Sequence, residues 1–389
     1  MKILAIESSC DETSAAVVEK SGEEIKVLSN ITATSLEIHA GTGGIIPENA
    51  ARMQVKYIMP VIIEALQSSG LDPQLSVKGQ SVNQLTGQQK THRQASENGK
   101  LETDNSLVQQ ILRDQIDAIA VTYGPGLIGS LLVGVETAKT LSFVFNKPII
   151  PVNHLLAHLF ANFISCSTSS YSLATSPFPF IGLIVSGGHT DLLLFEGIEN
   201  YKWLGGTRDD AAGEALDKIG RLLGLSYPAG PEIERRARLG SKTKIRFHAP
   251  LLGEKTYDFS FSGLKTEAMR YIQKQSTMNH ELLTNSSLIN EICFAVQKAV
   301  IDVLVRKTLS ATQEYDAKNI LLGGGVSANN TLREAFKQKT KDQGLKTNIF
   351  APQQKYCTDN AAMVGTYALL HQELSNWENV SVNPELYFA

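Results

Sequence analysis

The chain lacks three features that would each narrow its class at once: an excess of basic residues, paired cysteines and a long apolar run. Its 36 lysines and arginines stand against 39 aspartates and glutamates, which gives a formal net charge of -3. A protein that binds nucleic acid by itself usually carries a strongly basic surface. Any nucleic-acid contact of this chain must therefore be local or shared with a partner.

Cysteine is scarce and scattered. The chain has four in 389 residues, at Cys10, Cys166, Cys293 and Cys357, and none belongs to a CxxC pair. This pattern resembles neither the disulfide framework of a small secreted protein nor a zinc ribbon. A reducing compartment fits best, and we expect a cytoplasmic protein.

Targeting and membrane signals are also missing. No apolar run reaches the roughly 20 residues that a membrane span needs. The chain runs directly from Met1 into a strand-like segment, without the apolar stretch of a signal peptide or the Arg-rich helix of a transit peptide. We expect no membrane partner.

The residues that are present describe a globular protein, 42% hydrophobic and 19% charged. A pattern of strand, polar turn and strand occurs at 2–7 and 15–19, and again over 180–195. The repeat predicts an α/β protein with two related lobes whose hairpin tips face one cleft. We expect an N-terminal lobe over 1–170, a C-terminal lobe over 171–358, and a terminal helix and tail over 359–389, the helix packing back on the first lobe.

Helical spacing of apolar residues predicts helices over 210–225, 288–310 and 359–374, and a buried strand leads into a glycine turn near 319–325. From residue 68 to about 113 the chain is rich in Gln, Ser, Asn and Lys, with little hydrophobic periodicity. We interpret about 73–113 as a mobile surface insertion, for which a partner-binding loop and plain disorder are equally good readings.

Three glycine turns each follow a predicted strand: Gly124-Pro125-Gly126, Gly187-Gly188 and Gly323-Gly324-Gly325. Any one of them is explained by tight-turn geometry. Together they favour a bound anion, because glycine lets backbone amides approach a ligand. Asn329 follows the last turn, where a contact to a base or ribose and a helix N-cap fit the spacing almost equally.

His154 and His158 are four residues apart, so on a helix both imidazoles lie on one face and can share a metal. Asp359 is the best third ligand, since a carboxylate completes a mixed site for iron or zinc. Without it, packed or capping histidines explain the pair as well. A metallopeptidase of the HExxH type would need a glutamate where this chain has Leu155.

Acidic side chains gather in two places. Asp11 and Glu12 lie at the first hairpin tip, where a carboxylate can hold a metal, orient a hydroxyl or accept a proton, although acids in turns are usually just solvated. Asp210, Glu214 and Asp217 recur along one predicted helix beside a thin Ala-Gly face, which fits either a ligand surface or an ordinary polar stripe.

Nine segments taken together closely resemble the universal tRNA N6-adenosine threonylcarbamoyltransferase family, its bacterial and organellar branch above all. They are IESSCDETSAAVV, GGIIPENAAR, GPGLIGSLLVG, PVNHLLAH, VSGGHT, DDAAGEALDKIGRLLGL, DFSFSGLKT, GGGVSANNTLR and CTDNAAM. They cover nearly the whole chain apart from the insertion, and several are long enough to be highly specific.

The resemblance implies a fold like that of actin, sugar kinases and heat-shock chaperones, with two ribonuclease-H-like lobes around a nucleotide cleft. It implies transfer of threonylcarbamoyl from threonylcarbamoyl-adenylate to N6 of the adenosine beside the anticodon in ANN-decoding tRNAs, with release of AMP. ATP or ADP are further expected occupants of the cleft. The implied partners are tRNA, a non-catalytic paralogous subunit, a small ATPase and a separate enzyme that makes the adenylate.

The resemblance also assigns residues. His154, His158 and Asp359 match the ligands of one divalent metal, iron or zinc, and Asp11 and Glu12 are our hypothesis for the catalytic proton acceptor. The residues that match the adenylate site are Ile184, Val185, Ser186, Gly187, Gly188, Asp217, Gly230 and Asn329. The chain departs from the family at Thr42, Gln54 and Ala229, where Tyr, His and Gly are common.

Two other classes share the implied fold: an ATP-hydrolysing kinase or chaperone-like ATPase, and a catalytically idle scaffold that pairs with a transferase. Kinases and chaperones use the cleft without an HxxxH pair, and the non-catalytic paralogue typically lacks the metal ligands. The complete set of two histidines and one aspartate therefore favours the transferase.

Overall fold

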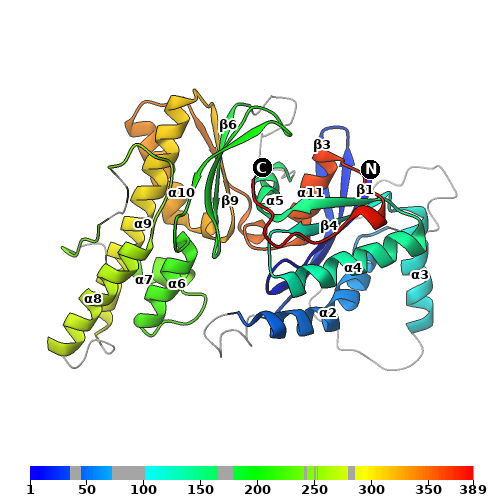
Figure 1. The fold of residues 1–389 in the computed structure, drawn as a ribbon, viewed down its shortest axis with the longest axis horizontal. Helices are drawn as coiled ribbons and strands as arrows, with labels where there is room; N and C mark the ends of the chain where they lie inside the picture. The colour runs from blue at the N-terminus through cyan, green and yellow to red at the C-terminus, as the bar shows by residue number, and fades with distance from the viewer. Residues whose placement is uncertain are drawn as a thin grey trace.

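The computed structural model describes residues 1–35, 45–71, 101–164, 178–240, 243–248, 251, 253–278 and 285–388. Two mixed five-stranded sheets lie side by side, each with helices packed on its faces (Figure 1). The chain is therefore an α/β protein, as its sequence predicts.

The first sheet has the strand order β3-β2-β1-β4-β5. β1 is antiparallel to β2 and parallel to β4, β2 is antiparallel to β3, and β4 is parallel to β5. The strands are β1 (Lys2–Glu7), β2 (Glu12–Ser21), β3 (Glu24–Thr34), β4 (Ala118–Gly124) and β5 (Ile149–Asn153).

β2 begins three residues before the predicted strand, so the predicted turn over 8–14 was too long. Thr13 and Ser14 are polar, yet both are buried in the sheet. The Ser14 hydroxyl donates to the carbonyl of Ile31 at 2.9 Å and accepts the N–H of Ala361 at 3.0 Å. A polar residue such as serine suggests a turn, but here Ser14 belongs to a strand. Its hydrogen-bond partners lie far along the chain, so local sequence does not reveal them.

Successive side chains of β1 point to opposite faces of the first sheet. Leu4 and Ile6 join the core beneath α2 (Pro47–Gln67), α3 (Leu101–Asp114) and α4 (Ile128–Phe145). Ile3 and Ala5 join the opposite core with α5 (His154–Phe160) and α11 (Ala361–His371). α11, predicted over 359–374, thus packs on the first sheet although it closes the chain.

The prediction that 68–113 has little hydrophobic periodicity is wrong for the last part of this range, which forms a helix with one apolar face. α3 spans Leu101–Asp114, and Val108, Ile111 and Leu112 are buried in the core against the first sheet. These side chains recur at three- and four-residue spacing on one helix face. The rest of the predicted insertion, up to residue 100, lies outside the described residues.

The second sheet has the strand order β10-β9-β6-β7-β8. β6 and β7 form the predicted hairpin around 186–189, and β9 runs parallel to β6. The strands are β6 (Phe180–Val185), β7 (Thr190–Phe195), β8 (Tyr201–Gly206), β9 (Asn319–Gly323) and β10 (Asn348–Phe350). The helices here are α6 (Ala212–Leu222), α7 (Gly230–Ala237), α8 (Ser262–Met278), α9 (Ser286–Glu314) and α10 (Asn330–Asp342).

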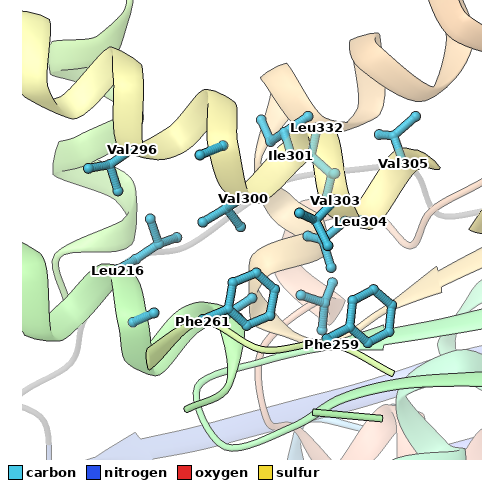
Figure 2. Packing of buried hydrophobic residues seen from close by; sticks show 14 of the residues in the cluster. Leu216, Phe259, Phe261, Val296, Val300, Ile301, Val303, Leu304, Val305 and Leu332 are labelled. Atoms are coloured by element: carbon cyan, nitrogen blue, oxygen red, sulfur yellow. The ribbon is translucent and has the colours of Figure 1, made fainter. Parts of the chain in front are cut away.

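α9 carries the core of this second half. Val300, Val303 and Leu304 lie over the rings of Phe259 and Phe261, and all five side chains are buried (Figure 2). The helices predicted over 210–225 and 288–310 are present as α6 and α9, with bounds shifted by a few residues. The packing of α9 supports the hairpin β6–β7 on one face of the second sheet.

α4 is the described helix that is long and apolar enough to cross a membrane by length and composition. Core helices pass the same test, and α4 buries Val135, Ala138 and Leu141 against the first sheet. Its opposite face leaves Ile128, Leu132, Phe143 and Val144 exposed.

α5 lies between the two sheets. A Cβ on Gly182 of β6 would be 2.5 Å from Leu159, and one on Gly323 of β9 would be 2.8 Å from the backbone of His158. At Gly323 the near atoms are backbone, so only glycine allows this approach, whereas the Leu159 side chain beside Gly182 can adjust. The two strands of the second sheet therefore press against the helix that carries the histidine pair.

Candidate metal centre and adenylate site

The histidine pair is set by the start of α5. The Asn153 side chain caps the helix by accepting the N–H groups of Leu155 and Leu156 at 2.9 and 3.2 Å. His154 and His158 follow one turn apart, with ring centroids 4.7 Å from each other. Both are buried, at 8% and 1% exposure, so these are interior histidines and not surface ones.

Asp359 completes the cluster from the turn before α11. Its Oδ1 lies 3.2 Å from Nε2 of His158 and 3.6 Å from Nε2 of His154. One ligand atom from each of the three residues lies within 4.8 Å of the others. Burial would raise the pKa of Asp359, but the adjacent histidines hold it well below its usual range.

Glu7, at the end of β1, stands behind His154 and was missed by the sequence reasoning. Its Oε2 lies 3.2 Å from Nδ1 of His154 and accepts the hydroxyl of Thr122 at 2.6 Å, while Oε1 accepts the N–H of Ser9 at 2.6 Å. Burial alone would lower the pKa of His154, but Glu7 and Asp359 raise it to about 9. Glu7 fixes Nδ1 as the donor and leaves Nε2 for the cluster.

The donor set fits a divalent transition metal. Two imidazoles and a carboxylate suit iron or zinc. Neither ring nitrogen of the buried His158 makes a hydrogen bond to any of the described residues, which leaves polar atoms for a ligand. A carboxylate behind a ligating histidine is the usual outer partner of such sites. The three residues named from the sequence are thus brought together.

Glu12 is not a solvated turn acid. Oε1 accepts the Thr34 hydroxyl at 2.9 Å, while Oε2 is buried without a hydrogen-bond partner in the described part of the chain. Burial raises the pKa of Glu12 to about 7, and Asp11 and Asp359 add to the rise. Glu12 therefore lies in the electric field of the cluster with a pKa suited to proton transfer near neutral pH.

The turn before Glu12 is clamped by Gln54 of α2. Its side-chain amide donates to the carbonyls of Ser8, Cys10 and Glu12 at 3.2, 3.0 and 3.2 Å. The carbonyl of Asp11 accepts the Ser35 hydroxyl at 2.7 Å. Gln54, one of the departures from the family pattern, thus has a defined structural role here. Thr42 lies outside the described residues.

The hairpin tip after β6 offers open backbone. A Cβ on Gly187 or Gly188 would meet nothing within 4 Å, so neither glycine is required by packing. The tip is closed by Ser186 N–H donating to the His189 carbonyl at 2.8 Å and His189 N–H donating to the Ser186 hydroxyl at 3.1 Å. Ile184 and Val185 lie in the buried strand that leads to it.

The other glycine turns differ from this one. Gly324 has a φ of 89° and faces the carbonyl of Val185 too closely for a side chain, which joins the tip to the turn after β9. A Cβ on Gly124 would overlap the Asn383 carbonyl, and Gly126 N–H donates to the Pro384 carbonyl at 3.2 Å. The turn at 124–126 is thus occupied by the C-terminal segment.

The three remaining residues matched to the adenylate site lie on α6, α7 and α10. Asp217 accepts the N–H of Ala229 at 2.7 Å, and Gly230 begins α7 with open space around it. Asn329 is the N-cap of α10: its carbonyl accepts the N–H of Leu332 and its amide donates to Gln297, both at 3.0 Å. Both polar ends of Asn329 therefore have protein partners.

Two acids of the predicted α6 stripe have structural partners. Asp210 pairs with Lys218 at 2.6 Å and Lys265 at 2.9 Å, and Glu214 pairs with Lys218 at 2.8 Å. Ala229, where the family commonly has glycine, has a φ of -84°, which any residue adopts. This departure carries no backbone strain.

His189, at the end of the open tip, is a second residue that the sequence reasoning did not select. Burial, reinforced by the charges of His154 and His158, lowers its pKa to about 4. Its imidazole is therefore neutral at pH 7 and lies in the field of the metal-ligand cluster. Its position after the glycine pair was the available signal.

Comparisons with known proteins identify the family of the chain. Residues 26–77 and 90–366 match the family model described as tRNA N6-adenosine threonylcarbamoyltransferase. Proteins of that name from Moorella thermoacetica and Geotalea uraniireducens are 40% and 41% identical, over 98% and 97% of this chain and 95% and 94% of theirs. Full-length HypF in a phosphate- and nucleotide-bound form is 13% identical, with a TM-score of 0.52 over 97% of this chain and 47% of its own, which shows a likeness of fold alone.

Proposed function

Because the chain belongs to the tRNA N6-adenosine threonylcarbamoyltransferase family, we propose that it takes threonylcarbamoyl from threonylcarbamoyl-adenylate and transfers it to N6 of the adenosine beside the anticodon in ANN-decoding tRNAs. AMP leaves. The observation that carries this proposal is the buried cluster of His154, His158 and Asp359, which an ATPase or an idle scaffold of this fold would not need.

The proposed architecture is that of the actin, sugar kinase and heat-shock chaperone superfamily, with two ribonuclease-H-like lobes around a nucleotide cleft. The lobes span 1–170 and 171–358, and 359–389 returns to the first lobe. We place the adenylate, and ATP or ADP when present, against the open tip of β6–β7. Its proposed contacts are Ile184, Val185, Ser186, Gly187, Gly188, Asp217, Gly230 and Asn329.

In the transfer step the N6 nitrogen attacks the carbamoyl carbon, and the bond from that carbon to the phosphate oxygen breaks with its electron pair leaving on AMP. The N6 proton passes to the carboxylate of Glu12, whose pKa of about 7 suits a base near neutral pH. Burial keeps that pKa high, and repulsion by the carboxylate of the adjacent Asp11 adds to it. We assign these two residues the catalytic role.

One divalent cation, iron or zinc, would be held by His154, His158 and Asp359, and there it would stabilise the charge that develops on the transferred group. Glu7 orients His154, and the cap of α5 by Asn153 keeps both histidines on one face. The exposed amides of Gly187 and Gly188 suit the phosphate of the adenylate.

The net charge of -3 suits an enzyme that holds tRNA together with partners. We propose a non-catalytic paralogous subunit and a small ATPase as these partners, an adenylate-forming enzyme as the supplier, and the cytoplasm as the location.

The test is a reconstitution. The protein is incubated with the adenylate-forming enzyme, threonine, bicarbonate, ATP, tRNA and the partner subunits, and the tRNA nucleosides are analysed by mass spectrometry. We expect N6-threonylcarbamoyladenosine with the wild type and a loss of more than about 100-fold with His158→Ala, the loss typical of a removed catalytic electrostatic group.

The matched control is His248→Ala, since His248 is exposed and, among the described residues, its side chain pairs with Glu267. It should retain wild-type yield. Absence of product from the wild type in every partner combination contradicts the transferase, and a normal yield from His158→Ala contradicts the role of the cluster.

A further inference from the structure

Asp191, the second residue of β7, is a fully buried carboxylate with an incomplete set of partners. Its Oδ1 accepts two hydrogen bonds, from the Trp203 indole at 3.1 Å and from the Tyr387 hydroxyl at 2.8 Å. Its Oδ2 is buried and makes no hydrogen bond to the described residues, but it lies 3.8 Å from Nδ1 of His189. A small rotation of that imidazole would make Nδ1–H the missing donor.

Such a bond would decide what His189 can do. A neutral imidazole that donates through Nδ1 presents Nε2 as an acceptor. The ring follows the open Gly187-Gly188 backbone, and this tip packs against Gly324, whose neighbour Gly323 lies against the backbone of His158. The hairpin tip therefore lies beside the cluster, and the pKa of His189 responds to the charges of His154, His158 and Asp359. The group in transfer carries an N–H and an O–H, which are the donors that such an acceptor binds.

Tyr387 is itself held in place by the segment 380–388. The N–H of Asn383 donates to the carbonyl of Tyr123 at 2.8 Å, and Gly126 donates to the Pro384 carbonyl. Phe388 contacts Tyr201 of β8 edge to face, with ring centroids 6.5 Å apart. The segment is therefore anchored on β4 of the first sheet and on β8 of the second, and its tyrosine reaches Asp191 between them.

We propose that His189 contacts the threonylcarbamoyl group held at the metal-ligand cluster, and that Asp191 and Tyr387 are positioning residues that aim its imidazole. This inference rests on the proposed function and adds a substrate-contacting residue outside the matched adenylate set. It gives the C-terminal segment a function in the reaction.

The experiment is a double-mutant cycle in the reconstituted assay with Tyr387→Phe, His189→Ala and the double variant. Tyr387→Phe removes one hydroxyl, and we expect kcat/KM for the adenylate to fall about tenfold, the size of a lost hydrogen bond to a charged group. His189→Ala should fall further. Because Tyr387 acts through His189, the double variant should be no worse than His189→Ala.

The matched control is Tyr257→Phe. It removes another tyrosine-carboxylate bond in the second half of the chain, from Tyr257 to Glu314 at 2.6 Å, which is exposed. Its kcat/KM should equal that of the wild type, and all variants should keep the wild-type metal content and KM for tRNA. Losses that multiply in the double variant, or an unchanged His189→Ala, overturn the proposal.

A readout independent of activity separates this inference from the proposed function. In ¹⁵N-histidine spectra of the full chain, the His189 resonances are identified by their loss in His189→Ala. Tyr387→Phe should shift them, and Tyr257→Phe should not. If the wild type modifies no tRNA, the proposed function fails, and an unshifted His189 signal in Tyr387→Phe refutes the positioning role in either case.

Discussion

At the scale of single residues, the site depends on carboxylates whose surroundings differ sharply. Glu7 has all of its hydrogen-bond partners and its pKa is kept low by His154 despite burial, whereas Glu12 has an unpartnered buried oxygen and a pKa near 7. The negative charge of Asp359 raises the pKa of both carboxylates. The first orients a ligand, and the second is available to take up a proton.

The pKa of Glu12 predicts the pH dependence of the reaction. In the proposed mechanism the carboxylate of Glu12 is the base, so kcat should rise with pH and reach half its maximum near pH 7, or lower when a divalent cation in the site stabilises the anion. Glu12→Gln should reduce kcat by about 100-fold or more at every pH. Single-turnover rates from pH 5.5 to 9 provide the measurement.

The same shift has a consequence for stability. The folded pKa of Glu12 lies above its unfolded value, so between about pH 4.5 and 7 the native state binds more protons and loses stability as pH rises. Glu12→Gln should therefore raise Tm at pH 8 relative to the wild type and change it little at pH 4.5. Glu19→Gln, on the same strand but ion-paired with Lys2 at the surface, is the control and should show neither effect.

At the scale of elements, the start of α11 places the third ligand. Asn360 caps the helix by accepting the N–H of Met363 at 3.1 Å, and its amide donates to the carbonyls of Thr358 and Tyr356 at 2.7 and 3.3 Å. These bonds hold the turn that carries Asp359. The cap therefore serves the helix and the metal-ligand cluster together.

Asn360→Ala should cost about 1–2 kcal/mol of unfolding free energy, the upper range for a lost N-cap, because Asn360 is buried. It should also weaken metal binding about tenfold, as outer-shell changes do. Asn285→Ala is the matched control, since Asn285 caps α9 through the N–H of Leu288 at 3.1 Å. It should lower stability with no change in metal affinity, as denaturation and metal titration would measure. Equal metal affinity in both variants would refute this role of the cap.

At the scale of the whole molecule, the cluster joins segments that are distant in the chain. β1, α5 and the turn before α11 meet because the first sheet orders β1, β4 and β5 side by side and α11 packs across it (Figure 1). Glu7 and His154 are 147 positions apart, and Ser14 binds Ala361 across 347. A cation at this point would stabilise the folded chain against separation of these segments.

Metal binding should therefore raise Tm. At a free concentration 100 times its Kd, a ligand specific for the native state adds about 2.7 kcal/mol of stability. Calorimetry of the wild type with Zn²⁺ or Fe²⁺ should show a rise that a chelator reverses. His158→Ala should show no rise, and His248→Ala should behave like the wild type. An equal rise in His158→Ala would place the metal elsewhere.

Much of this could be predicted from local sequence. Short apolar runs on either side of a polar turn predict β1 and the β6–β7 hairpin, glycine pairs mark the open tip, and the four-residue spacing of His154 and His158 predicts one helix face. The reading failed at α3, where a Gln- and Asn-rich context obscured the apolar face, and at Ser14, whose partners are remote. It also missed Glu7 and His189.

The sequence by itself determined the α/β class, the family and the histidine pair of a candidate metal site, because the motifs that carry them are short and local. Only the tertiary structure decided that Glu7 lies behind His154, that Glu12 is buried with a raised pKa, and that Tyr387 reaches Asp191. Those facts depend on strand order and on how the last segment packs, and contacts across more than a hundred positions leave no periodic trace in the chain.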